Sequence, residues 1–89
     1  MVRLSLNQIL GKNIKYFRYK QNITQEKLAE LLEVSANYIG RLERGQHNPS
    51  LNKIEKISTA LKIKPYELFM ENENAKNLPS RVNLSNFKN

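Results

Sequence analysis

Apolar residues recur at intervals of three and four along most of the chain, which is the period of an α-helix that buries one face. The stripe that begins at Leu10 predicts a first helix over residues 6–21. Ser5 and Gln8 fit a capping box at its start, and Asn22 suits the left-handed conformation that ends a helix. Alternation of apolar and polar residues, which marks a half-buried strand, is nearly absent, so we predict an all-α fold.

Three further helices are predicted, each opened by a serine or threonine that can accept a hydrogen bond from the first turn. These are Thr24 before residues 25–32, Ser35 before residues 36–44, and Ser50 before a helix that continues to Leu61. Gly45 ends the second of them. The apolar residues expected to be buried in the three helices are Leu28, Ala29, Leu31 and Leu32; Ile39 and Leu42; and Leu51, Ile54, Ile57 and Leu61.

Beyond the fourth helix, Pro65 fits the first turn of a fifth one over residues 66–70. From Glu71 the composition shifts towards asparagine, and the apolar residues follow no sustained helical period. We therefore divide the chain into a domain, residues 1–70, and a tail, residues 71–89. Disorder of this tail is favoured over an ordered arm that binds a partner or a second copy of the chain.

Charge narrows the choice of partner. Fifteen Lys and Arg against eight Glu give a net charge of +7, and the residues before Ile23 hold five of the basic residues with no acidic one. Such a surplus indicates phosphate polymers or an anionic membrane surface. Tyr16 and Tyr19 interleave with lysines and leave no separate insertion face, which argues against the membrane. The apolar runs are too short for a membrane span or signal peptide, so we expect a soluble, cytoplasmic protein.

Residues that support catalysis or metal binding are scarce. The chain has no cysteine, and its one histidine, His47, has no aspartate to orient it. The glycine patterns that cradle nucleotide phosphates, G-x-G-x-x-G and G-x-x-x-x-G-K-[ST], do not occur. We therefore expect no enzymatic activity, no cofactor and no metal site.

The second and third predicted helices form the most informative pattern. Two short helices joined by a turn of about three residues, the second opened by Ser35, make a helix-turn-helix. Ala29 is small enough to let the two backbones approach where they cross. The side chains expected to face outward from the second of these helices are Ala36, Asn37, Gly40, Arg41 and Arg44.

Several spaced motifs resemble the phage-repressor and Cro-type (Xre-like) helix-turn-helix family over about residues 9–70. They are ITQEKLAE at 23–30, VS at 34–35, YI at 38–39, RLERG at 41–45, NPSL at 48–51 and AL at 60–61. The resemblance implies a compact five-helix, lambda-repressor-like domain that binds operator DNA, usually as a two-fold dimer, with the third helix in the major groove. We therefore expect a sequence-specific transcriptional regulator that acts as a repressor and binds double-stranded DNA as a homodimer on an inverted repeat.

A second function is compatible with the same motifs. An antitoxin uses this kind of DNA-binding domain and also masks a toxin protein. Residues 71–89 would then be the segment that binds the toxin, becoming ordered on contact.

The resemblance also implies roles for single residues. Ala36, Asn37 and Arg41 match positions that face base edges, and their chemistry agrees: asparagine pairs with adenine, arginine with guanine, and a methyl group contacts thymine. Gln25 matches a position that binds a phosphate at a helix start. Further phosphate candidates are Ser35, Tyr38, Arg44, His47 and Asn48. The structural alternatives are a plain helix cap for Ser35, cover for the core edge for Tyr38, an ordinary exposed loop position for His47, and solvated surface positions for Asn37 and Arg41.

Other implied roles are structural. Arg18 and Glu43 are expected to form an ion pair beneath the DNA-binding face, and the dimer surface is expected to include Tyr66, Phe69 and Met70. Three residues depart from the family pattern. Glu33 and Lys62 stand where helix-ending glycines are common, and Lys64 stands where a capping serine is common.

Overall fold

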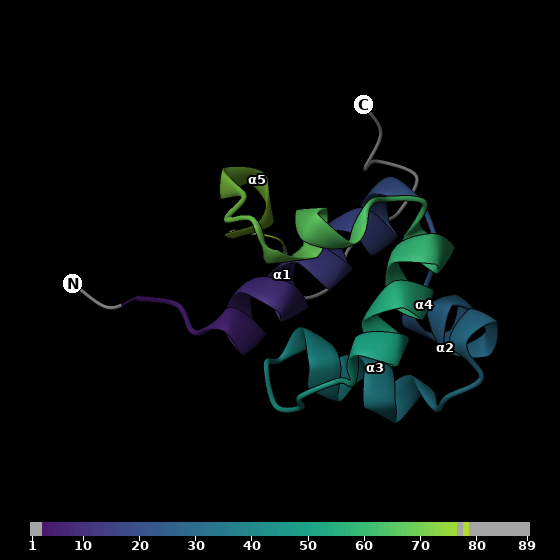
Figure 1. Ribbon diagram of the computed structural model, residues 1–89. Coiled ribbons are helices and arrows are strands. Elements are labelled where there is room, and N and C mark those ends of the chain that lie inside the picture. Colours follow the sequence, from purple (N-terminus) through teal and green to yellow (C-terminus); the bar gives the residue numbers. More distant parts are fainter. Residues whose placement is uncertain (1–2, 77, 79–89) are drawn as a thin grey trace.

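The computed structural model describes residues 3–76 and residue 78. In that part of the chain all regular structure is helical, as predicted (Figure 1). The elements are α1 (Leu6–Lys20), α2 (Gln25–Leu32), α3 (Ala36–Glu43), α4 (Leu51–Leu61), the 3-10 helix η1 (Pro65–Phe69) and α5 (Glu73–Lys76). None of the described helices combines the length and hydrophobicity that crossing a bilayer requires.

The four longer helices begin at their predicted caps. Ser5 Oγ accepts a hydrogen bond from the Gln8 amide at 3.2 Å, and Gln8 Oε1 accepts one from the Ser5 amide at 2.8 Å, which completes the capping box. Thr24, Ser35 and Ser50 each accept from the backbone N–H three residues on. A cap of this kind contributes about 1 kcal/mol, so the sequence defines these starts locally.

Three helices end beside a left-handed residue that is not glycine, and one of these residues, Asn22 after α1 with φ 62°, was predicted. Glu33 has φ 58° at the end of α2, and Lys62 has φ 61° at the end of α4. The conformation costs such residues about 1 kcal/mol each. It is held because the next residue bonds back into the helix, as Val34 N does to Ala29 O at 3.0 Å. The chain can therefore reverse at Glu33 without the glycine that is common there.

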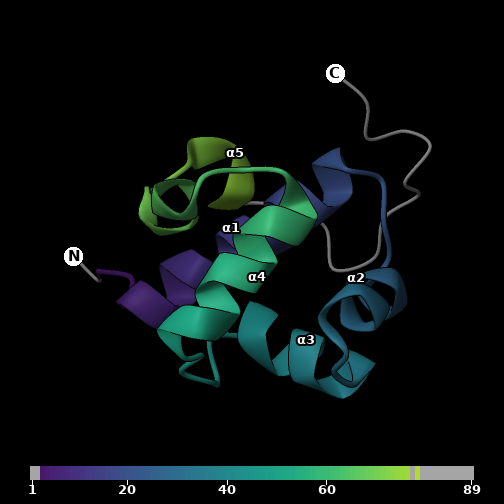
Figure 2. The same cartoon turned by 45° about the vertical axis from the view of Figure 1, so that its right-hand side comes forward.

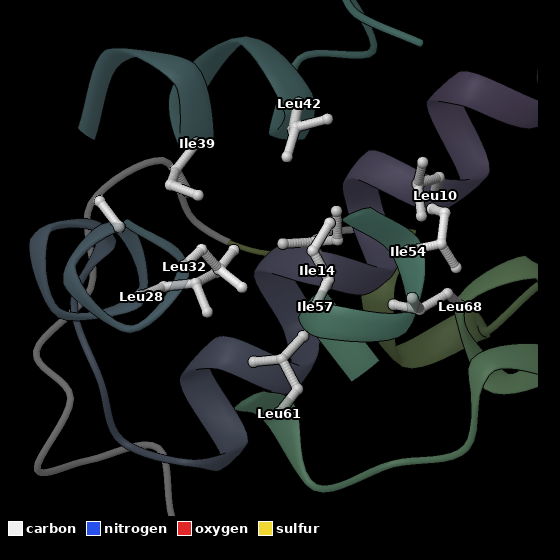
Figure 3. Packing of buried hydrophobic residues seen from close by; sticks show 11 residues of the cluster. Leu10, Ile14, Leu28, Leu32, Ile39, Leu42, Ile54, Ile57, Leu61 and Leu68 are labelled. Carbon is white, nitrogen blue, oxygen red and sulfur yellow. The ribbon is translucent and has the colours of Figure 1, made fainter. Parts of the chain in front are cut away.

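One hydrophobic core joins the helices. Figure 3 shows Ile14 of α1 facing Ile57 of α4 at its centre. The remaining fully covered members of this core are Leu10, Leu28, Ala29, Leu32, Ile39, Leu42, Ile54, Leu61 and Leu68. Each buried leucine or isoleucine contributes about 1.5–3 kcal/mol. The core therefore fixes α3 against α1 and α2.

Two residues predicted to be buried are not. Leu51 is 83% exposed and Leu31 is 49% exposed. Leu51 is the first residue of α4 and lies one turn before Ile54, where that helix enters the core. Leu31 lies on the flank of α2 beside the buried stripe that Leu28 and Leu32 form. The predicted stripes were therefore too wide by one residue each.

The backbones of α1 and α3 touch where the two helices cross. A Cβ atom on Gly11 would lie 2.6 Å from the carbonyl oxygen of Glu43 and closer still to that of Leu42. Only a residue without a side chain allows this approach. The sequence analysis gave Gly11 no role, although an isolated glycine inside a helix, which costs about 1 kcal/mol there, is itself a signal of close packing.

The end of the domain differs from its prediction. The fifth helix is a 3-10 turn, η1, and the buried amide of Asn13 binds carbonyls at its end: Asn13 Nδ2 donates to Leu68 O and Met70 O, both at 2.8 Å. Within the segment predicted as the tail, α5 packs against α1 and Ala75 is buried. Residues 77 and 79–89, which include most of the proposed toxin-binding segment, lie outside the described residues.

Candidate nucleic-acid interface

The helix-turn-helix lies at one edge of the molecule, where α3 forms the outermost element and α2 lies beside it (Figures 1 and 2). Ile39 and Leu42 lock α3 inward at 0% and 1% exposure, and Ala29 of α2 is buried at the crossing. Because the inner face of α3 is fixed, its outer face is held in one orientation. A rigid, outward helix face is what recognition of duplex DNA requires.

That outer face carries polar and cationic side chains. Asn37, Arg41 and Arg44 are exposed and follow the spacing i, i+4, i+7, which places them in one stripe along the helix. Ala36, the third residue predicted to face bases, is half-buried and packs partly against the core. Gly40 was expected to face outward and is instead buried, because Arg44 and Gln25 cover it.

Beneath this face lies the ion pair expected from the sequence. Arg18 Nε is 2.7 Å from Glu43 Oε2, and Arg18 Nη2 is 3.2 Å from Glu43 Oε1. The two side chains are only 6% and 5% exposed. Arg18 Nη1 also donates to Ile23 O at 3.1 Å. The pair therefore ties α1 and α3 to the segment that leads into α2.

Gln25 belongs to the same network, which the sequence analysis did not foresee. Its Nε2 atom donates to Glu43 Oε1 at 3.0 Å. An amide nitrogen carries two hydrogens, so one N–H of Gln25 is engaged with Glu43 and the second can meet an external acceptor. Glu43 thus orients a donor at the N-terminal end of α2, where the helix dipole also attracts anions.

A second group of phosphate candidates gathers around the loop after α3. The rings of Tyr38 and His47 meet edge to face at 4.8 Å between centroids. Burial raises the pKa of Tyr38 above its usual 10, with the charge of Arg41 opposing the shift, so its hydroxyl stays neutral and able to donate. Lys53 Nζ lies 6.0 Å from the Tyr38 ring centre, a cation that the sequence analysis did not select.

The remaining candidates lie at the rim. Asn48 accepts a hydrogen bond from the side-chain amide of Asn7 at the start of α1, so residues far apart in sequence meet here. Ser35 Oγ caps α3 by accepting from the Tyr38 amide at 3.0 Å, and its hydroxyl proton remains available. An open polar hollow of about 480 Å³ lies here and is lined by Asn7, Gly45, Gln46, His47 and Asn48.

Lys15 lies near the buried Arg18–Glu43 ion pair, which is called the clamp below. Burial lowers the pKa of this half-buried lysine, and the nearby Glu43 carboxylate opposes the shift.

Among the described residues, no group of three or more His, Cys, Asp or Glu side chains could hold a metal ion. The assembled features are cations, amides and hydroxyls around an exposed helix.

The fold and this surface define a helix-turn-helix DNA-binding protein. A helix-turn-helix family model matches residues 14–68. The chain is 40% identical over 65 residues to control protein C.BamHI of Bacillus amyloliquefaciens, which covers 72% of this chain and 80% of that protein. It is 39% identical over 54 residues to the immunity repressor protein of Bacillus phage phi105, which covers 61% of this chain and 38% of that protein.

A solved structure agrees. The crystal structure of the restriction-modification controller protein C.AhdI from Aeromonas hydrophila matches with a TM-score of 0.67 at 41% identity, and covers 71% of this chain and 96% of that chain. The chain therefore belongs to the helix-turn-helix family of Cro/Xre type, a generally non-enzymatic family of DNA-binding transcription regulators. The family predicted from the sequence motifs is confirmed.

Proposed function

We propose that this regulator reads a specific double-stranded DNA site by placing α3 in the major groove. The observation that carries the proposal is the exposed stripe on a helix whose opposite face is locked into the core. The major groove admits an α-helix and presents a distinct pattern of donors and acceptors for each base pair. Affinity then comes from neutralised phosphates, and specificity comes from Asn37 and Arg41 of that stripe together with Ala36.

Base reading falls to the first two turns of α3. Asn37 has the paired donor and acceptor that match adenine, and Arg41 has the planar donors that match guanine. Both are exposed. Ala36 would contribute a methyl contact to thymine from its uncovered side. Each arginine or asparagine pair of this kind contributes about 1–3 kcal/mol of discrimination.

Phosphate binding falls to the surroundings of that helix. Gln25 supplies its second N–H at the start of α2, where the free backbone amides support it. The other side chains proposed to bind phosphates are Ser35, Tyr38, Arg44, His47 and Asn48. The net charge of +7 supports a polyanionic partner.

The regulator would act in the cytoplasm as a homodimer on an inverted repeat, repressing transcription by occupancy and without a cofactor or a reaction. Tyr66 is 61% exposed and Met70 is 56% exposed, and Phe69 packs beside them against the core. Exposed apolar groups on so small a domain support self-association. Two α3 helices about 34 Å apart would match successive major grooves on one side of the duplex.

Selection of bound DNA from a random duplex pool, followed by sequencing, tests this function. We expect one enriched motif with two-fold symmetry and half-sites about one helical turn apart. The double variant Asn37→Ala/Arg41→Ala serves as the matched control, because both side chains are exposed and their removal leaves the core intact. Recovery of unenriched sequences by the unaltered protein would contradict the proposal.

A further inference from the structure

Arg44 shares the azimuth of a proposed base-reading residue. It follows Asn37 by seven residues, so the two lie only about 20° apart around the helix axis. Both are exposed, whereas the flanks of the outer face are formed by half-buried Tyr38 on one side and by Gln25 on the other. Arg44 therefore projects from the same outer face as Asn37, at the side of the stripe that is nearer to Gln25.

Gly40 brings the Arg44 guanidinium towards the start of the helix. A Cβ atom on Gly40 would lie 3.1 Å from Arg44 Nη1, tighter than ordinary van der Waals contact. The guanidinium therefore lies over the bare backbone of Gly40, one turn nearer the N-terminal end of α3. Side chains on a helix lean in this direction, and the N-terminal part of a recognition helix is the part that reaches base edges.

Gln46 holds the same side chain from behind. Arg44 Nε donates to Gln46 Oε1 at 3.0 Å, which engages the inner edge of the guanidinium. The terminal nitrogens Nη1 and Nη2 are left as a planar pair of donors. Such a pair matches the O6 and N7 acceptors of guanine in the major groove.

We propose that Arg44 is a further base-reading residue that selects guanine. Gly40 leaves the space in which the Arg44 guanidinium lies, and Gln46 is the residue that positions it. The proposal rests on the proposed function, since α3 has to lie in the major groove. It replaces the phosphate role of Arg44 with a specificity role. The base pair that Arg44 reads is distinct from the one that Arg41 reads.

Selection from a random duplex pool with single variants tests the proposal. Arg44→Ala is expected to lose the preference for guanine at one base pair by about 5- to 150-fold while the rest of the motif stays. Gln46→Ala and Gly40→Ala are expected to weaken the preference at that same base pair. Arg41→Ala is expected to weaken the preference at a different base pair. Lys56→Ala, which removes an equal charge from the exposed surface of α4, is expected to change no base preference.

The failures are distinguishable. If Arg44→Ala keeps every base preference and lowers affinity for all sequences by a similar factor, Arg44 is a phosphate contact, and this proposal is overturned while the proposed function stands. If the unaltered protein enriches no motif, both fall. Thermal unfolding of the variants checks folding, and we expect an unchanged midpoint for Arg44→Ala because its side chain is exposed.

Discussion

Glu43 is the residue on which the binding face is built. Its carboxylate accepts from Arg18 with both oxygens and from Gln25 with one, while the backbone of Glu43 lies against Gly11. Three helices therefore meet at one buried anion. Desolvation offsets much of the attraction within such a pair, so its value lies in fixing geometry as much as in stability.

Removing Arg18 exposes that dependence. Arg18→Ala leaves the Glu43 carboxylate buried without its cation, and we expect the free energy of unfolding to fall by about 3–5 kcal/mol. Urea denaturation measures the change. The double variant Arg18→Met/Glu43→Leu should lose less, because it leaves no unpaired buried charge. Full stability of Arg18→Ala with lost DNA binding would show that Arg18 contacts DNA and is no clamp.

Single-residue variants can also distinguish the proposed base contacts from the proposed phosphate contacts. Arg41→Ala should cost about 1–3 kcal/mol on the selected site and relax the preference at one base pair. Gln25→Ala, its matched comparison, should weaken binding to all sequences about equally, because a phosphate contact carries no sequence information. Competition binding with single-base variants of the site measures both. An unchanged preference in Arg41→Ala would remove Arg41 from the base-reading set.

At the scale of helices, the crossing of α1 and α3 sets the position of α3, the helix that we propose reads DNA. Gly11→Ala would force a methyl group against the Leu42 and Glu43 carbonyls. We expect a loss of about 1–3 kcal/mol of stability from overpacking, together with weaker DNA binding as α3 shifts. Lys20→Ala, on the exposed end of the same helix, should change stability by less than about 0.5 kcal/mol in the same denaturation assay. Equal stability of the two variants would contradict the close crossing.

Helix starts and ends were predictable because their causes are local. Ser35 caps α3 by accepting a hydrogen bond from the backbone of the residue three positions on. Asn22 lies just after α1 in the left-handed conformation, with φ 62°. The hydrogen bonds that hold the end of η1 were not predictable, because they come from Asn13, more than fifty residues away. The packing of α5 against α1 is likewise a tertiary effect that a periodicity pattern does not contain.

The candidate site divides along the same line. The outward direction of Arg41 follows from helical spacing. The family motifs predicted that Arg18 pairs with Glu43, and the structure confirms this ion pair. Burial of Gly40 and the bond between Arg44 and Gln46 were missed. Both depend on how one long side chain folds back along α3, which residue type and spacing leave open.

At the scale of the whole molecule, the proposed homodimer would determine how DNA is bound. If the exposed Tyr66 lies in the dimer surface, Tyr66→Glu should weaken dimerisation about tenfold or more, because a buried tyrosine anchor is replaced by a charge. Sedimentation velocity over a concentration series measures this. Lys56→Glu, a charge change on the exposed surface of α4, is the control. A monomer at every concentration in the unaltered protein would contradict the dimer.

The central claim is that α3 distinguishes base pairs. Its most direct test is the ratio of affinities for the selected site and for a scrambled duplex, measured by fluorescence anisotropy at one moderate salt concentration. We expect a ratio of about 10³ or more for the unaltered protein and a large loss of that ratio, with folding retained, in Asn37→Ala/Arg41→Ala. A ratio near one for the unaltered protein, or an undiminished ratio in the double variant, would contradict it.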